Sequence, residues 1–177
     1  MARIQTVNRN ETSAEVNATL DAVKKKIGVV PNLFATFANA PAALNGYLAF
    51  SEALTHGRLT AAQRESLALA VGQANSCQYC LSAHTLLGKG AGLNSSDISE
   101  ARAGNALDEV TDGLLKLAVK IVNQRGVLSD SDIAQAKSSG VDDGLIIEVI
   151  ANVALNTLTN YTNHIAATEI DFPVVAV

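Results

Sequence analysis

Apolar positions along the chain recur with helical spacing, and turn residues divide them into short segments. The pairs Thr12…Glu15 and Thr60…Gln63 have the spacing of a capping box at a helix start, and Gly28 follows one segment as a helix stop. No long run alternates polar and apolar residues as a half-buried strand does. The pattern predicts helices over residues 12–27, 32–38, 41–56, 60–74, 76–89, 95–103, 108–125, 130–138 and 142–168.

Length and composition agree with one helical domain. The chain has 177 residues, which is enough for a single domain with a sizeable core. Aromatic residues make up only 4% and tryptophan is absent, which favours helices over a β-sandwich. We therefore predict one compact all-α, multi-helix domain over residues 1–177. Residues 57–84 and 126–164 each contain a turn, a short capped helix and an apolar helix with a histidine, a pattern consistent with an internal pseudo-repeat.

Both cysteines and one of the three histidines lie within ten residues, Ser76 to Thr85. Their spacing is Cys-x2-Cys-x3-His, formed by Cys77, Cys80 and His84. If this stretch is helical, the three side chains fall within about 60° of one face. Two thiols and an imidazole would then converge on one patch, as redox or metal chemistry requires.

Three other interpretations compete with redox chemistry. The cysteines could be small apolar core residues that lie three apart by chance. A structural disulfide is disfavoured, because its loop is very short and stabilisation grows with loop length. Zinc commonly takes four ligands, and Cys77, Cys80 and His84 leave the fourth unaccounted for.

The redox interpretation has a physical mechanism. Asn75-Ser76 is a good N-cap signal and would place both thiols in the first helical turn, where the helix dipole favours thiolates. His84, one turn later, can take or relay a proton. A sulfenic acid on one cysteine would be resolved by the other as a disulfide, which completes a two-electron peroxidase cycle.

An upstream carboxylate adds to this pattern. On a helical wheel for residues 60–75, Glu65 shares its side with Ala68, Leu69 and Gly72, where a carboxylate is unusual. It could lie at the edge of a solvated face and pair with Arg64. Alternatively, it is a partly buried carboxylate suited to proton transfer.

The motif Glu65-x11-Cys77-x2-Cys80-x3-His84 resembles the alkylhydroperoxidase D-like proteins of the carboxymuconolactone decarboxylase superfamily. The Val29–Phe34 segment is similar to the peroxidase-related branch of that superfamily. The resemblance covers about residues 20–170, which we take as the core of the domain. It implies an all-helical fold and a homo-oligomer, typically a trimer or hexamer.

The resemblance also implies a role for each residue of the motif. Cys80 would attack the peroxide, Cys77 would resolve the product, and Glu65 and His84 would relay protons to Cys80. No cofactor and no metal are expected, and a dithiol or a thioredoxin-like protein would be the reductant. One position departs from the best-known peroxidases of the family, which carry a histidine where this chain has Tyr79. A phenol can donate a hydrogen bond but cannot act as a base near neutrality.

Charge and hydropathy indicate few other partners. The formal net charge is −4, which does not suggest binding to nucleic acid or to an anionic membrane surface. No apolar run approaches the ~20 residues of a spanning helix, and residues 1–6 hold no apolar signal-peptide region. A free cysteine pair fits a reducing compartment, so we expect a cytoplasmic protein.

The last predicted helix carries a row of polar residues on an apolar sequence. Its members recur every four residues: Glu148, Asn152, Asn156, Asn160 and His164. This row could be a solvated ridge, could form hydrogen bonds in a subunit interface, or could border the thiol pocket.

Three function classes follow from the sequence. The first is a thiol peroxidase that reduces hydrogen peroxide or organic hydroperoxides. The second is a carboxymuconolactone decarboxylase-type enzyme, which is disfavoured because its chemistry does not need the cysteine pair. The third is a non-peroxidase thiol-disulfide oxidoreductase or redox sensor on the same fold.

Overall fold

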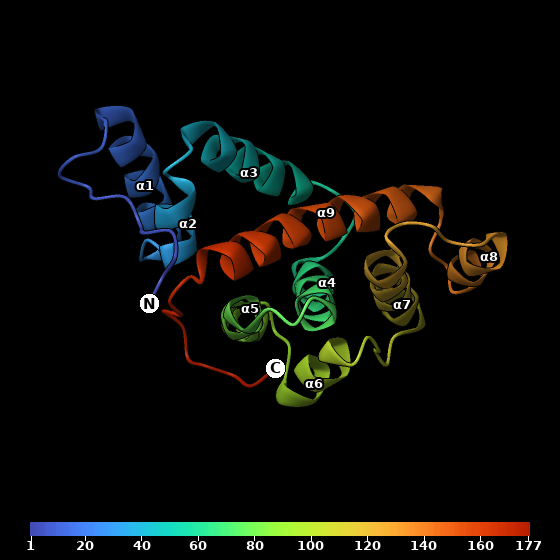
Figure 1. Ribbon diagram of the computed structural model, residues 1–177. Coiled ribbons are helices and arrows are strands. Elements are labelled where there is room, and N and C mark those ends of the chain that lie inside the picture. Colours follow the sequence, from blue (N-terminus) through green and yellow to red (C-terminus); the bar gives the residue numbers. More distant parts are fainter.

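One long helix organises the molecule in the computed structural model, which describes residues 1–177. This helix, α9 (Asp143–Ala166), lies across α4 (Ala61–Ala74), α5 (Gln78–Gly90) and α7 (Glu109–Gln124) (Figure 1). α4 is the central helix, because it packs against α5, α6, α7 and α9. The remaining helices are α1 (Ala14–Ile27), α2 (Asn32–Phe37), α3 (Pro41–Leu54), α6 (Ser95–Arg102) and α8 (Asp130–Ser138).

The prediction of a compact all-α domain is confirmed, and all nine predicted segments are helical within a few residues of the predicted bounds. Thr60 and Gln63 form the predicted capping box at the start of α4. The predicted cap of the first helix is wrong by one residue, because Ser13 and not Thr12 accepts the hydrogen bond from the first turn.

The core has two parts. The larger part lies between α4, α7 and α9 and includes Leu67, Leu114 and Val149, all fully buried. The smaller part joins α1, α2 and α3 to the start of α5, and the cysteines belong to it together with Leu20 and Leu44. The thiols therefore sit where the N-terminal helices cover the α4–α5 pair.

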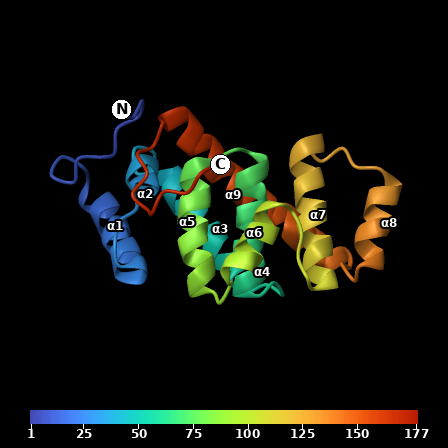
Figure 2. The ribbon, with the colours of Figure 1, turned by 90° about the horizontal axis from the view of Figure 1, so that it is seen from below.

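The C-terminal segment 167–177 passes along α5 (Figure 2). Val175 receives a hydrogen bond from Gln78 Nε2 on its carbonyl (3.1 Å) and donates its own N–H to Ser82 Oγ (3.2 Å). This segment thus covers a face of the helix that carries Cys80. No helix combines the length and the apolar character that crossing a bilayer requires.

Candidate active site

The turn between α4 and α5 places the cysteines. Ser76 has a left-handed backbone (φ 54°), and this reversal lets the N–H of Cys77 donate to the carbonyl of Gly72 (2.8 Å). Cys77 is therefore the N-cap of α5, and the prediction that Asn75-Ser76 caps this helix is wrong. Cys80 lies in the first turn, as predicted.

The two thiols touch each other inside the protein. The Sγ atoms are 2.6 Å apart, and the S–H of Cys77 donates to Cys80. Cys77 is 1% exposed and Cys80 is 2% exposed. A disulfide has an S–S length of about 2.05 Å, so the pair can be bonded without rearrangement of the helices.

The surroundings lower the pKa of the Cys80 thiol and raise the pKa of the Cys77 thiol. The hydrogen bond from Cys77 is the largest cause that lowers the pKa of Cys80, and it outweighs the opposing effect of burial. His84 and the amides of Asn163 and Asn160 lower it further. The same hydrogen bond and burial raise the pKa of Cys77. Cys80 is therefore the thiolate of the pair and Cys77 the thiol.

Glu65 and His84 form a pair beside the thiols. His84 Nδ1 lies 2.8 Å from Glu65 Oε2, and the two side chains are 21% and 22% exposed. Burial opposes the charged imidazole, but the Glu65 carboxylate outweighs it and raises the pKa of His84. The expected partial burial of Glu65 is thus confirmed, and the pair is held between a buried thiol and solvent.

The three asparagines of the polar row on α9 lie inside the protein, whereas His164 at its end is exposed. Asn152, Asn156 and Asn160 are buried, so a solvated ridge is wrong for these three. Glu148 accepts hydrogen bonds from the backbone N–H groups of residues 58 and 59, and His164 bonds the carbonyl of Asn75. Of the residues in this row, Asn160 is the one that lies beside the Cys80 thiol.

Sequence reasoning missed Asn163. Its Nδ2 donates to Cys80 Sγ at 3.3 Å, and the residue is buried. It lies three residues after Asn160 and outside the four-residue row, so the periodicity did not mark it. The sequence did contain one signal for it, because Asn163 is a further polar residue on the same side of an otherwise apolar helix as Asn160, and a buried polar group needs a partner.

Tyr79 and Tyr47 complete the surroundings. The hydroxyl of Tyr79 accepts from the N–H of Leu33 (3.1 Å) and donates to Asp171 (2.8 Å), so it ties α5 to α2 and the C-terminal segment. Tyr47, also missed from sequence, stacks on Phe37 with ring centroids 5.5 Å apart. Burial and the nearby Cys80 and Glu65 raise the pKa of Tyr47 to about 12. Neither phenol is a base.

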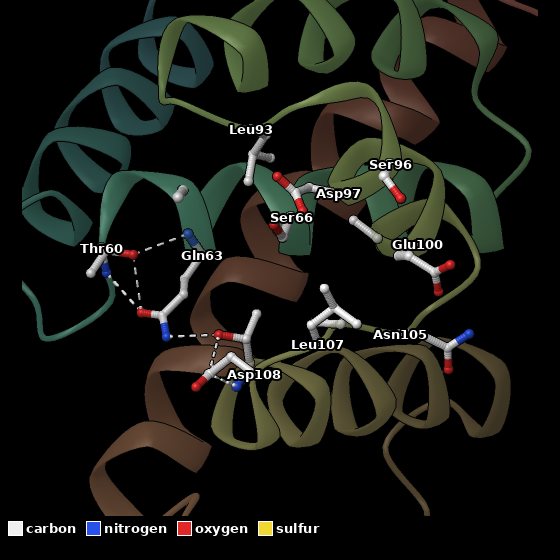
Figure 3. Close-up of a pocket in the computed structure, with 14 residues that line it drawn as sticks. Thr60, Gln63, Ser66, Leu93, Ser96, Asp97, Glu100, Asn105, Leu107 and Asp108 are labelled. Atoms are coloured by element: carbon white, nitrogen blue, oxygen red, sulfur yellow. Dashed lines mark hydrogen bonds between the residues drawn. The ribbon is translucent and has the colours of Figure 1, made fainter.

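A separate cavity of about 500 Å³ lies between α4, α6 and the loop before α7 (Figure 3). Gln63, Ser66, Glu100 and Asp108 are among its lining residues, and Gln63 Nε2 donates to Thr111 Oγ1 at 3.1 Å. None of the four predicted site residues lines it. No cluster of three or more His, Cys, Asp or Glu side chains has the arrangement of a metal site.

The arrangement of the helices is that of an alkylhydroperoxidase AhpD core. The crystal structure of an alkylhydroperoxidase AhpD core, an uncharacterized peroxidase-related protein from Ralstonia eutropha JMP134, superposes with a TM-score of 0.86 at 21% identity over 96% of this chain and 92% of that chain. An uncharacterized peroxidase-related protein from Silicibacter sp. TM1040 superposes with a TM-score of 0.80 at 20% identity over 94% of this chain and 92% of that one.

Residues 41–107 match the model of the carboxymuconolactone decarboxylase family. The matched range includes Glu65, Cys77, Cys80 and His84. The central part of the chain is therefore similar to the carboxymuconolactone decarboxylase family, and the whole chain has the fold of the two peroxidase-related proteins. No curated protein matches the sequence.

The same fold also occurs in a protein named for different chemistry. A cysteine-to-alanine variant of the debrominase Bmp8, in complex with 2,3,4-tribromopyrrole, superposes with a TM-score of 0.80 at 14% identity over 96% of this chain and 91% of that chain. The fold alone therefore does not define the reaction.

Proposed function

We propose that the protein is a thiol peroxidase that reduces hydrogen peroxide or organic hydroperoxides through Cys80 and Cys77. The observation that carries this proposal is the unequal thiol pair: a buried Cys80 with a lowered pKa, 2.6 Å from a Cys77 that remains a thiol. A thiolate is the nucleophile in peroxide reduction, and a second thiol within reach removes the sulfenic acid that forms.

The first step is attack of the Cys80 thiolate on the peroxide. A bond forms between Sγ and the terminal oxygen, the O–O bond breaks, and the second oxygen leaves as an alkoxide or hydroxide. Protonated His84, held by Glu65 at 2.8 Å, supplies the proton that converts it to an alcohol or water. Because the Tyr79 hydroxyl is bonded to Leu33 and Asp171, the relay in this chain would depend on His84.

The second step resolves the sulfenic acid. Cys77 sulfur attacks Cys80 sulfur, the S–O bond breaks, and water leaves with the Cys77 proton. An external dithiol or a thioredoxin-like protein then reduces the disulfide, which returns the two electrons given to the peroxide. Both sulfurs are buried, so this exchange requires a local opening of the cover formed by α3 or the C-terminal segment.

We further propose that the protein is a cytoplasmic homo-oligomer. A reducing compartment keeps a cysteine pair available for cycling. The outer face of α9 supports self-association, because it is apolar, uncharged and as long as the helix. Its exposed large side chains are Ile147, Ile150, Leu158, Tyr161 and Ile165. A trimer or hexamer is the state that the family resemblance implies.

A turnover assay tests the peroxidase proposal. Reduced protein is mixed with hydrogen peroxide or cumene hydroperoxide and dithiothreitol, and peroxide loss is followed. We expect Cys80→Ser to abolish turnover and His56→Gln, an exposed histidine away from the thiols, to leave it unchanged. Turnover that survives in Cys80→Ser would refute the proposal.

The same preparation separates the alternatives. A protein that forms its disulfide with a thiol-disulfide partner but never turns over peroxide would be an oxidoreductase or sensor. Activity on a muconolactone-type acid that is unaffected by Cys80→Ser would indicate a decarboxylase. Reductive removal of bromide from 2,3,4-tribromopyrrole would place the chain with the debrominase.

A further inference from the structure

Four buried asparagines follow the inner side of α9, and they fall into two pairs. Asn152 Nδ2 donates to the carbonyl of residue 148 (2.8 Å), and Asn156 Nδ2 donates to the carbonyl of Asn152 (2.9 Å). The Nδ2 groups of these two amides therefore find their hydrogen-bond acceptors within α9 itself. Asn160 and Asn163 make no such bond, because Asn160 bonds Asn75 and Asn163 bonds Cys80.

The second pair is held against the thiols instead. Asn163 Nδ2 donates to Cys80 Sγ at 3.3 Å. Asn160 Oδ1 accepts from Asn75 Nδ2 at 2.8 Å, which fixes the orientation of its amide. Asn75 ends α4 directly before the thiol turn, so both amides are anchored to the elements that carry the cysteines.

Each of these amides keeps one polar atom without a partner. Asn163 Oδ1 is buried and has no partner; Asn160 Nδ2 is buried with no partner at hydrogen-bond distance, although its amide lies close enough to Cys80 to help lower the pKa of that thiol. A buried polar atom without a partner is destabilising, and such atoms are rare in folded proteins. Here one unpartnered donor and one unpartnered acceptor occur side by side on α9, next to the nucleophilic sulfur.

A hydroperoxide group has the complementary chemistry. Its terminal oxygen carries one O–H donor and lone pairs that accept. We infer that Asn160 and Asn163 form a binding site for the terminal oxygen of the peroxide, with Asn160 Nδ2 donating to that oxygen and Asn163 Oδ1 accepting its O–H. This inference rests on the proposed peroxidase function and names the groups that would orient its substrate.

The step through this site balances without a further reactant. The Cys80 thiolate takes the terminal OH to form the sulfenic acid, and the O–O bond breaks. The leaving oxygen takes its proton from His84, and the transferred OH keeps its hydrogen bonds to both amides. The site therefore stabilises the group being transferred, while the Nδ2 of Asn163 stabilises the thiolate before attack.

The test compares two reagents at the same thiolate. Iodoacetamide alkylates Cys80 without transferring an oxygen atom. Hydrogen peroxide, in contrast, must bind with its terminal oxygen between the amides of Asn160 and Asn163 before it reacts. Rates of both are measured with reduced protein above the pKa of Cys80, where the thiol is fully ionised, and the modified cysteine is identified by mass spectrometry. Asn160→Ala is the variant and Asn156→Ala the matched control, because Asn156 is equally buried but bonds only its own helix.

We expect Asn160→Ala to slow the peroxide reaction about tenfold or more while alkylation stays within about twofold, and Asn156→Ala to change neither. If Asn160→Ala does not fold, Asn160→Leu fills the same volume and is measured in its place. Equal peroxide rates in the wild-type protein and the Asn160 variant would overturn the inference, as would equal slowing of both reagents.

A second readout separates this inference from the proposed function. If wild-type Cys80 alkylates but does not react with peroxide, the peroxidase proposal fails. In that case only the effect of the amides on the pKa of the Cys80 thiol is tested. Asn163→Ala should raise the pH midpoint of Cys80 alkylation, and a midpoint equal to that of Asn156→Ala would overturn the role of the amide pair.

Discussion

Replacing Cys77 by alanine or by serine should have opposite effects on Cys80. The S–H of Cys77 donates to Cys80 Sγ, and this bond is the largest cause that lowers the pKa of the Cys80 thiol. Serine keeps a donor at the same position, whereas alanine removes it. We expect Cys77→Ser to leave the pKa of Cys80 low and Cys77→Ala to raise it.

The structure gives the size of the effect. The surroundings lower the pKa of Cys80 to about 6. At pH 7 a thiol with that pKa is about 90% thiolate, whereas a thiol with the ordinary pKa near 8.5 is about 3% thiolate. Loss of the Cys77 donor should raise the pKa of Cys80 from about 6 toward its ordinary value. The rate of Cys80 alkylation should therefore be close to its plateau at pH 7 in Cys77→Ser, and should still increase with pH there in Cys77→Ala.

The assay is the pH dependence of Cys80 alkylation by iodoacetamide between about pH 4 and 10. The readout is the midpoint and not the rate at one pH, because a thiolate of higher pKa is also the stronger nucleophile. Both variants have one cysteine, so the label is unambiguous. Equal midpoints in the two variants would refute the assignment of Cys77 as the donor.

Three further predictions follow from the same contacts. Glu65→Gln and His84→Gln should each slow peroxide oxidation of Cys80 by about 10²–10⁴-fold in a folded protein, with a combined effect far from additive; lowered melting temperature with normal Cys80 oxidation would instead indicate a purely structural pair. Leu81→Ala, at a fully buried position, should lower the free energy of unfolding by about 2–5 kcal/mol in urea titrations, while Leu107→Ala, at a residue 96% exposed, should change it by less than about 0.5 kcal/mol. Ile165→Glu should shift an oligomer to smaller species in light scattering, and a wild-type protein that is monomeric at micromolar concentration would contradict the proposed assembly.

Helix positions were predictable because they depend on local chemistry. The Thr60 capping box and the glycine after the first helix are short-range signals, and both act as predicted. The start of α5 was misplaced because its turn depends on a bond from Cys77 back to Gly72 and on a left-handed Ser76. Serine is uncommon in the left-handed conformation, so the local sequence did not predict this turn.

The site was predictable only in part. The spacing of the cysteines and His84 indicated a common face, the helical wheel marked Glu65 as a carboxylate on an apolar side, and the family resemblance supplied the role of each residue. The packing of α4 on α5 then brings Glu65 and His84 to 2.8 Å, which helix periodicity alone could not establish. Asn163 was missed because its approach to Cys80 depends on where α9 crosses the α4–α5 pair, a tertiary contact between residues 83 apart in the chain.

The most direct test of the account is a single oxidation of the reduced wild-type protein. One equivalent of hydrogen peroxide is added, free thiols are counted, and the peptide that contains Cys77 and Cys80 is weighed. The account predicts that both thiols disappear together, that the peptide loses two hydrogens and gains no oxygen, and that dithiothreitol restores it. Two unchanged thiols, or a lasting oxygen on either cysteine without a disulfide, would contradict it.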